Sequence, residues 1–316
     1  MTPAPLVSVV LATNRNGPYL AATLESLAGQ TFTGWELILV DDGAPDPAAV
    51  EAAAAGLPGA RVIHQANAGV SAARNVGAAA GLGKYLAFLD DDDLWSPDRL
   101  ARQVAALEAR PEAVASYCQW DFMDEQGTVF GTGELRAGDL HDFLRHETRA
   151  PIPTLLITRR GLDRVGMFHP MLPPGEDLDL IYRLARTGPF VFVPDVLVHY
   201  RRHDANESGD LCAAALASRR ALWVQQWWSA RSDETELLDD VHVGLRQSRR
   251  YWTEQLVRAA AHEAGHGHLA AAGRYAAFVT RHDPVLGVRT VARMARGKLG
   301  RRGPDGADPP PPGDGP

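Results

Sequence analysis

The sequence is poor in cysteine and lacks long apolar runs. Its 316 residues include two cysteines, Cys118 and Cys212, which lie far apart and are too few for a disulfide framework, so we expect a reducing, cytoplasmic setting. No window approaches the roughly 18 consecutive apolar residues of a membrane span. The segment 1–5 carries no basic run ahead of an apolar stretch, so we expect a soluble protein that can still touch a membrane surface.

Basic charge is not in excess either. The 32 Lys and Arg residues against 39 Asp and Glu residues give a formal net charge of −7 at pH 7. A protein that coats duplex nucleic acid has the opposite balance, so nucleic acid is not expected as a partner. A hydrophobic content of 45% over this length is enough to bury the core of one large domain or two small ones.

The first third of the chain alternates short apolar runs with amphipathic stretches. It predicts strands at 7–12, 35–40, 61–64 and 85–89, separated by helices at 19–28, 47–55 and 71–80. This alternation is typical of a doubly wound, mostly parallel sheet, in which ligands bind beyond the carboxyl ends of the strands.

Composition changes along the rest of the chain. The middle predicts strands at 115–120, 155–158 and 190–193 and helices at 140–145 and 178–186, whereas 211–299 is rich in Ala, Arg and Leu at helical spacing. The end is rich in Pro and Gly and has no apolar content, which predicts disorder. We therefore expect an α/β domain at 1–205, a helical region at 206–300 and a disordered tail at 301–316.

Two predicted strands end in clustered carboxylates. The strand at 85–89 runs into the four aspartates 90–93, and the strand at 35–40 runs into Asp41 and Asp42. Parallel topology brings both acidic ends to one edge, and clustered oxygen ligands suit Mg²⁺ or Mn²⁺ that shares its coordination with substrate phosphates. The alternative is a solvated acidic turn ahead of a helix that begins at Ser96-Pro97.

Five motifs in this order resemble the family-2 inverting glycosyltransferases of the GT-A fold. They are Val7 to Arg15, Gln30-Thr31-Phe32 with Trp35-Glu36-Leu37, Val40 to Gly43, Asn67 to Asn75, and Phe88 to Asp93. The resemblance covers about residues 6–205 and implies a GT-A-type mixed sheet, a Rossmann-like nucleotide-sugar fold. It also implies an enzyme that transfers a sugar, with inversion, from a nucleoside-diphosphate donor to an acceptor hydroxyl or amine. Among donors the resemblance implies a UDP-sugar first, with dTDP-linked and GDP-linked sugars as alternatives. The acceptor that it implies is a polysaccharide, a lipid-linked saccharide, a protein or a natural product.

The resemblance also assigns roles to individual residues on the donor side. Those that match nucleotide-binding positions are Thr13, Asn14, Arg15, Asp42, Arg74, Asp90 and Asp91. Asp92 matches the ligand of the divalent metal, Mn²⁺ or Mg²⁺, although a shift by one residue would exchange the roles of Asp91 and Asp93 with those of Asp90 and Asp92.

Two later motifs complete the expected site. Glu176 and Asp177 lie in the first turn of a predicted helix, where acidic residues also compensate the helix dipole. Displacement at a sugar carbon needs a carboxylate to take the acceptor's proton, and the resemblance assigns this role to Asp177, with Glu176 as the second candidate. The segment 199–203 resembles the family's Tyr-Arg-x-His motif, which implies that His203 is a metal ligand and that Arg201 contacts the diphosphate, with His199 behind them.

Other classes of protein remain as alternatives. A nicotinamide oxidoreductase would need G-x-G-x-x-G after the first strand, which the segment 13–17 does not have. A non-catalytic nucleotide-sugar-binding protein of the same fold would keep these motifs. A zinc metallopeptidase is suggested by His262, Glu263 and His266, which match H-E-x-x-H; the plain interpretation is a histidine-rich turn between helices.

Two helical segments carry patterns of their own. Trp223, Trp227 and Trp228 lie in one predicted helix, where they indicate a core-facing stripe, or else a sugar-stacking wall or a contact between subunits. The segment 284–302 has arginines at helical spacing beside small apolar residues. Such a helix can lie peripherally on an anionic membrane, at its inner face for a cytoplasmic protein, although a plain solvated helix fits the pattern equally well.

Overall fold

The structure is a computed structural model that describes residues 4–15, 17–57, 59–172, 175–203, 206 and 210–299. The chain divides into two compact units. The α/β unit comprises Met1–Phe143 and Thr148–Asp204, and the helical unit comprises Leu144–Glu147 and Ala205–Pro316. Each unit is described by itself, and the predicted tail at 301–316 lies outside the described residues.

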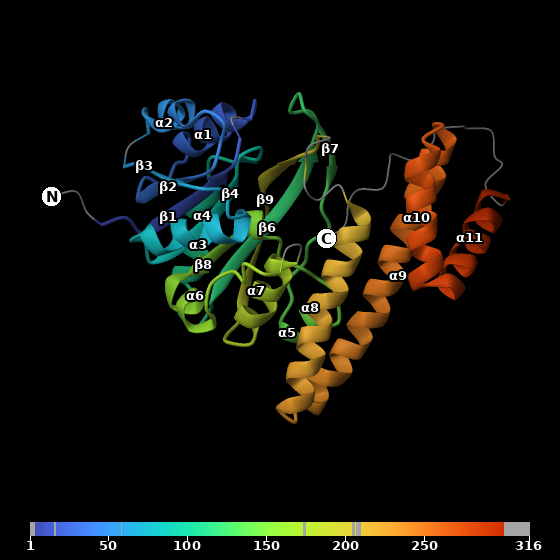
Figure 1. Cartoon of the computed structure of the whole chain (residues 1–316). Coiled ribbons are helices and arrows are strands. Elements are labelled where there is room, and N and C mark those ends of the chain that lie inside the picture. The colour runs from blue at the N-terminus through green and yellow to red at the C-terminus, as the bar shows by residue number, and fades with distance from the viewer. Residues whose placement is uncertain are drawn as a thin grey trace. The chain divides into compact units, whose positions relative to one another are not determined.

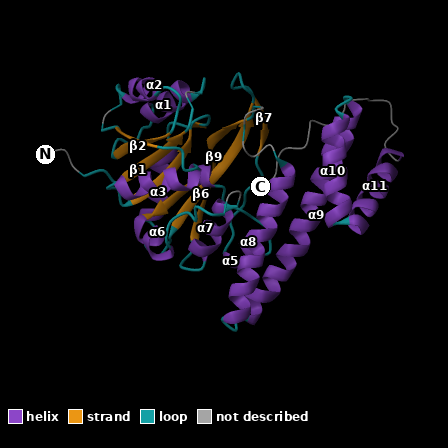
Figure 2. Cartoon of the chain, viewed as in Figure 1, coloured by secondary structure: helices purple, strands orange, loops and turns teal. Residues whose placement is uncertain are grey.

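A mixed sheet forms the centre of the α/β unit (Figure 2). Its strands are β1 (Val7–Thr13), β2 (Trp35–Asp42), β3 (Arg61–Gln65), β4 (Tyr85–Asp90), β5 (Leu94–Trp95), β6 (Ala115–Met123), β7 (Val129–Thr132), β8 (Leu155–Thr158) and β9 (Phe190–Arg201). Their order is β3-β2-β1-β4-β8-β6-β9-β5, and β7 pairs with β6. Strands β3, β2, β1 and β4 are parallel, whereas β8 runs antiparallel to both β4 and β6. The predicted doubly wound mixed sheet is confirmed.

Strand register brings the acidic strand ends together. Thr13 at the end of β1 lies opposite Asp41 on β2, and the preceding Ala12 lies opposite Asp90 on β4. Because these strands are parallel neighbours, their carboxyl ends form one edge of the sheet, where ligands bind in doubly wound folds.

Helices cover both faces of the sheet (Figure 1). The helices of the α/β unit are α1 (Leu20–Ala28), α2 (Pro47–Ala54), α3 (Val70–Ala80), α4 (Arg99–Glu108), α5 (Leu140–Leu144, whose last residue belongs to the helical unit), α6 (Arg159–Val165) and α7 (Glu176–Ala185), with a short 3₁₀ turn at Ile152–Thr154. Leucines of α1 and α4 share one buried cluster with Val7, Val9 and Leu11 of β1, whereas Ala73 of α3 packs with Ile38 of β2 in another. Alternation along the strands therefore supplies apolar side chains to both layers.

Several elements differ from the sequence expectation. The strands β5 and β7 and the helix α6 were not expected, and β9 continues to Arg201 instead of ending at Val193. Pro194 lies within β9, where the pairing jumps from Cys118–Val193 to Gln119–Val196. This bulge accommodates a proline that cannot donate a ladder hydrogen bond, so the strand resumes after it.

The helical unit is built from α8 (Leu211–Arg231), α9 (Thr235–Gly265), α10 (Leu269–His282) and α11 (Pro284–Leu299). Its core contains Ala215, Trp252, Leu256, Tyr275 and Val279. The buried carboxylate of Asp283, which precedes α11, pairs with Arg219 of α8 and Arg249 of α9. In the described part of the chain, no helix is both long and apolar enough to span a membrane.

The tryptophan stripe of α8 does not face the core. Trp223, Trp227 and Trp228 are 53%, 59% and 51% exposed, whereas Leu222 and Gln225 occupy the buried side of the helix. The prediction of a core-facing stripe is therefore wrong, because α9 packs on the alanine-rich side of α8 instead. A sugar-stacking or subunit-contact role for these tryptophans stays a prediction.

Candidate active site

An acidic loop, residues 90–93, joins β4 to β5 at the carboxyl edge of the sheet. Thr13 Oγ1 donates a 2.5 Å hydrogen bond to Asp91 Oδ2. Arg15 Nη2 lies 3.1 Å from Asp92 Oδ2 and 3.5 Å from Asp91 Oδ1. The end of β1 thus supplies both a hydroxyl group and a cation to the loop.

The segment that follows β9 also contacts the acidic loop. His203 Nε2 lies 3.0 Å from Asp92 Oδ2, and its side chain is 5% exposed. The imidazole stacks on Tyr19 with 5.0 Å between ring centroids. The sequence analysis does not assign Tyr19 to the site. Its position between the Gly17-Pro18 break and the first helix could have indicated a role for this aromatic residue.

Arg201 holds the shape of the acidic loop. Its main-chain N–H donates to Asp93 Oδ1 at 3.0 Å, and its guanidinium donates to the main-chain carbonyls of Asp92, Asp124 and Glu125 at 3.0, 3.3 and 2.9 Å. The Tyr19 ring packs against the guanidinium, with 4.6 Å between the Arg201 Cζ atom and the ring centroid. The expected contact of Arg201 with a diphosphate stays a prediction.

His199 has partners away from Asp92. Its Nδ1 lies 2.7 Å from Asp121 Oδ1 on β6, and its Nε2 lies 3.0 Å from Ser96 Oγ, just after β5. These contacts tie three strands together behind the acidic loop and leave His203 as the histidine that contacts Asp92.

The acidic loop concentrates buried negative charge. Burial, followed by repulsion from Asp90 and Asp91, raises the pKa of Asp92 to about 6. Burial also raises the pKa of Asp91, and burial with repulsion from Asp92 raises that of Asp93 well above its usual value. Such carboxylates are stabilised in their ionised form by an added cation.

The donor atoms of this loop fit a divalent cation. Carboxylate oxygen and imidazole nitrogen are ligands that Mn²⁺ accepts, and two cis ligands of an octahedral ion with bonds of about 2.1 Å lie about 3 Å apart. Asp92 and His203 have this separation. No three His, Cys, Asp or Glu side chains within the described residues form a ready metal cage. Mg²⁺ and Mn²⁺ commonly bind through one or two protein ligands, and substrate oxygens complete their coordination. Asp92 and His203 could supply the protein ligands.

Arg74 connects the acidic loop to the first turn of α7. It lies in α3 with 8% of its surface exposed, and its Nη2 donates to Asp90 Oδ1 at 2.7 Å. Its Nη1 lies 3.7 Å from Glu176 Oε1. Burial opposes the charge of Arg74, but the carboxylates of Asp90, Glu176 and Asp177 raise its pKa. The two clusters of carboxylates expected from the sequence, the acidic loop and the pair Glu176 and Asp177, therefore both interact with the charge of Arg74.

Glu176 and Asp177 begin α7 after Gly175, whose φ of +117° favours glycine. The Gly175 N–H donates to Glu176 Oε2 at 3.0 Å, and the Leu178 N–H donates to Asp177 Oδ1 at 2.7 Å. Burial raises the pKa of both carboxyl groups, whereas the nearby charge of Arg74 lowers it. An elevated carboxyl pKa suits proton abstraction near neutral pH.

Asp42 organises the turn that leads into α3. Its carboxylate accepts hydrogen bonds from Gln65 Nε2 and from the N–H groups of Ala68 and Gly69, at 2.7, 2.8 and 2.9 Å. It therefore fixes the start of the helix that carries Arg74. Asn14 is exposed beside this edge. Their expected roles in nucleotide binding stay predictions.

The H-E-x-x-H pattern lies in the helical unit. His262 and Glu263 belong to the last turn of α9, so the helix continues into the segment for which the sequence predicts a histidine-rich turn. His266 follows the helix. Glu263 pairs with His268 at 2.8 Å, and His266 Nδ1 contacts the carbonyl of His262. Since no three potential ligands converge in the described residues, a zinc peptidase is not supported.

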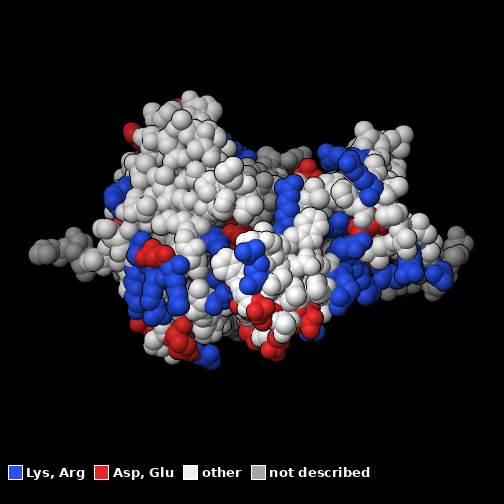
Figure 3. All heavy atoms as spheres, turned by 60° about the horizontal axis from the view of Figure 1, so that its bottom comes forward, with Lys and Arg blue, Asp and Glu red and all other residues white. Residues whose placement is uncertain are grey.

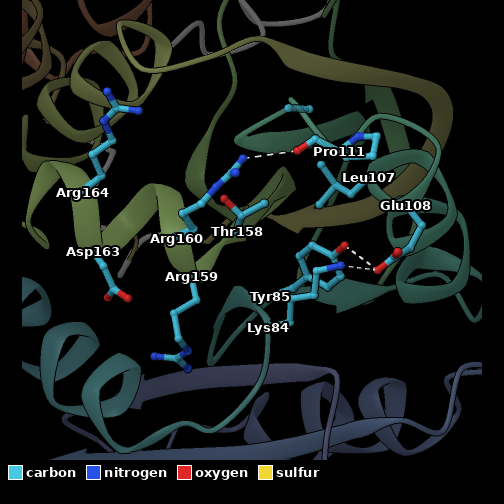
Figure 4. Close-up of a pocket in the computed structure, with 11 residues that line it drawn as sticks. Lys84, Tyr85, Leu107, Glu108, Pro111, Thr158, Arg159, Arg160, Asp163 and Arg164 are labelled. Atoms are coloured by element: carbon cyan, nitrogen blue, oxygen red, sulfur yellow. Dashed lines mark hydrogen bonds and ion pairs between the residues drawn. The ribbon is translucent and has the colours of Figure 1, made fainter.

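A pocket of about 870 Å³ lies at the other end of β4, near Tyr85 (Figure 4). Its cations are largely engaged: Lys84 pairs with Glu108 at 2.7 Å, and Arg159 donates to three main-chain carbonyls. Arg160 donates to the carbonyl of Pro111. These interactions join the start of α6 to the end of α3, to the segment between α3 and β4 and to the segment after α4, so we assign the pocket a structural role.

The mixed sheet, with carboxylates at the carboxyl end of β4, agrees with the GT-A-type fold that the resemblance of the sequence implies. A family model described as glycosyl transferase family 2 matches residues 8–165. The chain therefore belongs to glycosyl transferase family 2.

Relatives and solved structures agree with this family. An uncharacterized glycosyltransferase of Rickettsia typhi is 27% identical over 273 residues, which cover 82% of this chain and 85% of the relative. One from Rickettsia felis is 27% identical over 212 residues, 65% of this chain, but this chain spans only 35% of that relative's length.

Two solved structures resemble the fold. S. aureus TarS 1–349 in complex with UDP-GlcNAc has a TM-score of 0.61 at 15% identity, over 84% of this chain and 89% of that one. The mannosyltransferase PcManGT from Pyrobaculum calidifontis, in complex with GDP-Man and Mn²⁺, has a TM-score of 0.61 at 19% identity, over 94% and 81%. At these identities the likeness concerns the fold alone.

Proposed function

We propose that the protein transfers a sugar from a nucleoside-diphosphate donor to an acceptor hydroxyl or amine, with inversion and with Mn²⁺ or Mg²⁺. The observation that carries this proposal is the bridge made by Arg74 between Asp90 and Glu176. Arg74 links the acidic loop, whose carboxylates suit a metal ion, to Glu176 and Asp177, which suit the role of base. The proposed metal-assisted displacement at a sugar carbon uses both a metal ion and a base.

The donor side of the proposal consists of Thr13, Arg15 and the acidic loop, with Asn14, Asp42 and Arg74 along the same edge. A UDP-sugar is the donor that we propose first, because TarS was solved with UDP-GlcNAc, and a GDP-sugar is the second candidate because PcManGT was solved with GDP-Man. Asp92 and His203 would hold the divalent ion. When bound, that ion stabilises the negative charge on the departing diphosphate.

The acceptor side consists of Asp177, with Glu176 as the second candidate. Asp177 would accept the proton of the acceptor hydroxyl as the new bond forms, while Arg74 fixes the neighbouring Glu176 by charge. A single carboxylate acting as a base, with no second carboxylate as nucleophile, leads to one inversion at the anomeric carbon.

Substitution of the base tests the proposal. Asp177→Asn should lower kcat by about a hundredfold or more, because general-base catalysis contributes about 10²- to 10⁴-fold, with donor affinity retained. The measurement is donor turnover with a panel of nucleotide-sugars and saccharide acceptors, alongside calorimetric titration of the same donors. Asp163→Asn, on the exposed surface of α6, is the control that should leave both unchanged.

Three outcomes would contradict parts of the proposal. Unchanged turnover of Asp177→Asn together with loss in Glu176→Gln would transfer the role of base to Glu176. Retained anomeric configuration in the product, observed by proton NMR, would exclude single displacement. Donor binding without turnover on any acceptor would favour the non-catalytic alternative.

A further inference from the structure

The helix α11 packs on α9 and α10 through a narrow face of small side chains. Thr290 is 3% exposed, and Gly287 faces Val279 of α10 so closely that a Cβ at this position would clash. Leu286 and Met294 are half-buried along the same side. The contacts of α11 within the helical unit therefore use few of its apolar residues.

The outer face of α11 combines apolar and cationic side chains. Its apolar members, Val285, Val288 and Val291, are 65%, 71% and 54% exposed. Arg289, Arg293 and Arg296 are exposed on the same helix, and the sequence 284–299 contains no Asp or Glu. Lys and Arg side chains also gather over the C-terminal helices in the space-filling view (Figure 3).

Ion pairing within the protein accounts for only part of this charge. Arg293 pairs with Glu254 of α9 at 2.6 Å. Across the described part of the chain, Arg289 and Arg296 form no ion pair with a carboxylate. A solvated helix would expose polar residues where α11 exposes valines, so the pattern is that of a helix that lies in an interface.

We propose that the outer face of α11 binds the surface of an anionic lipid bilayer. Its valines would enter the boundary between headgroups and acyl chains, while Arg289 and Arg296 would contact anionic headgroups. A nucleic acid would match the arginines but not the exposed valines, whereas a bilayer surface accommodates both kinds of side chain.

Vesicle flotation with the full chain tests this proposal. The protein should float with vesicles of phosphatidylcholine and phosphatidylglycerol but not with phosphatidylcholine alone. The double variant Arg289→Gln/Arg296→Gln should lose about 25-fold in partitioning, since each basic residue near an anionic surface contributes about fivefold. Val288→Ser should also weaken binding, because the valine contribution does not depend on charge.

A matched control distinguishes binding through α11 from non-specific attraction between arginines and anionic lipid. Arg220→Gln/Arg231→Gln changes two exposed arginines of α8 by the same charge and should leave vesicle binding intact. Equal loss in this control, or flotation that ignores lipid charge, would overturn the proposal. A dimer on gel filtration that the α11 variants abolish, without vesicle binding, would assign the face to a second copy of the chain. Sugar-transfer activity to a soluble acceptor is measured separately and does not decide this test.

Discussion

At the residue scale, Arg15 competes with any other cation for the acidic loop. Its guanidinium contacts both Asp91 and Asp92, and its side chain is 38% exposed. Arg15→Gln should therefore raise the affinity of the donor-free protein for Mn²⁺ by up to about fivefold, since a partly exposed ion pair contributes at most about 1 kcal/mol. Isothermal titration with Mn²⁺ alone measures the change.

The same substitution should weaken binding of the donor. If donor and metal displace the guanidinium from the carboxylates, it would contact a diphosphate oxygen, whose charge glutamine cannot neutralise. Arg15→Lys is the control, because it keeps the charge and should leave Mn²⁺ affinity near that of the wild type. Unchanged Mn²⁺ affinity in Arg15→Gln would show that the contact with Asp92 has no energetic weight.

Arg74 sets the protonation of the proposed base. Its charge lowers the pKa of Glu176 and Asp177 against the effect of burial. A base must be ionised, so activity is retained above its pKa and lost as the pH falls through it. Arg74→Gln removes the charge, raises that pKa and should move the acidic limb of kcat/KM to higher pH. A profile of unchanged midpoint and uniformly lower rate would leave Arg74 with a binding role only.

At the scale of elements, the close approach of α3 to the sheet depends on Gly77. A Cβ at this position would clash with Val10 of β1 and come within 3.2 Å of Val40 of β2. Gly77→Ala should destabilise the α/β unit by about 1–3 kcal/mol, the usual effect of overpacking. Gly56→Ala, where the added Cβ meets nothing within 4 Å, is the control that should change the free energy of unfolding little. Denaturant unfolding followed by circular dichroism compares the two.

The elements that could be predicted from the sequence are those with strong periodicity. Strands β1, β2 and β4 are mostly apolar runs buried on both faces, which carry a clear signal, whereas β3 is short and only partly buried. By contrast, β5 has two residues and β7 is largely exposed, so neither has a distinctive pattern. The continuation of β9 past Pro194 depends on a bulge against β6 that only the folded sheet reveals.

In the predicted site, too, local motifs could be predicted from the sequence, whereas contacts that depend on the fold could not. The carboxylates of the acidic loop and of α7 could be predicted because each motif is local in the sequence. Their connection through Arg74 could not, since it joins segments about ninety residues apart and depends on how α3 and α7 pack. Likewise, Arg201 matched a motif, but its donation to main-chain carbonyls follows from the path of β9 beside the loop.

At the scale of the whole molecule, two separate hydrophobic cores predict two unfolding transitions. The α/β unit and the helical unit are compact by themselves, and the proposed donor and metal groups all belong to the former. Mn²⁺ with a bound nucleotide-sugar, at about a hundredfold excess over its Kd, should stabilise that unit by about 2.7 kcal/mol. Calorimetry should then show one transition raised by about 5–10 °C and the other unmoved. A single transition that shifts as a whole would mean that the units unfold together, and Asp92→Asn, measured with the same ligands, should abolish the shift in either case.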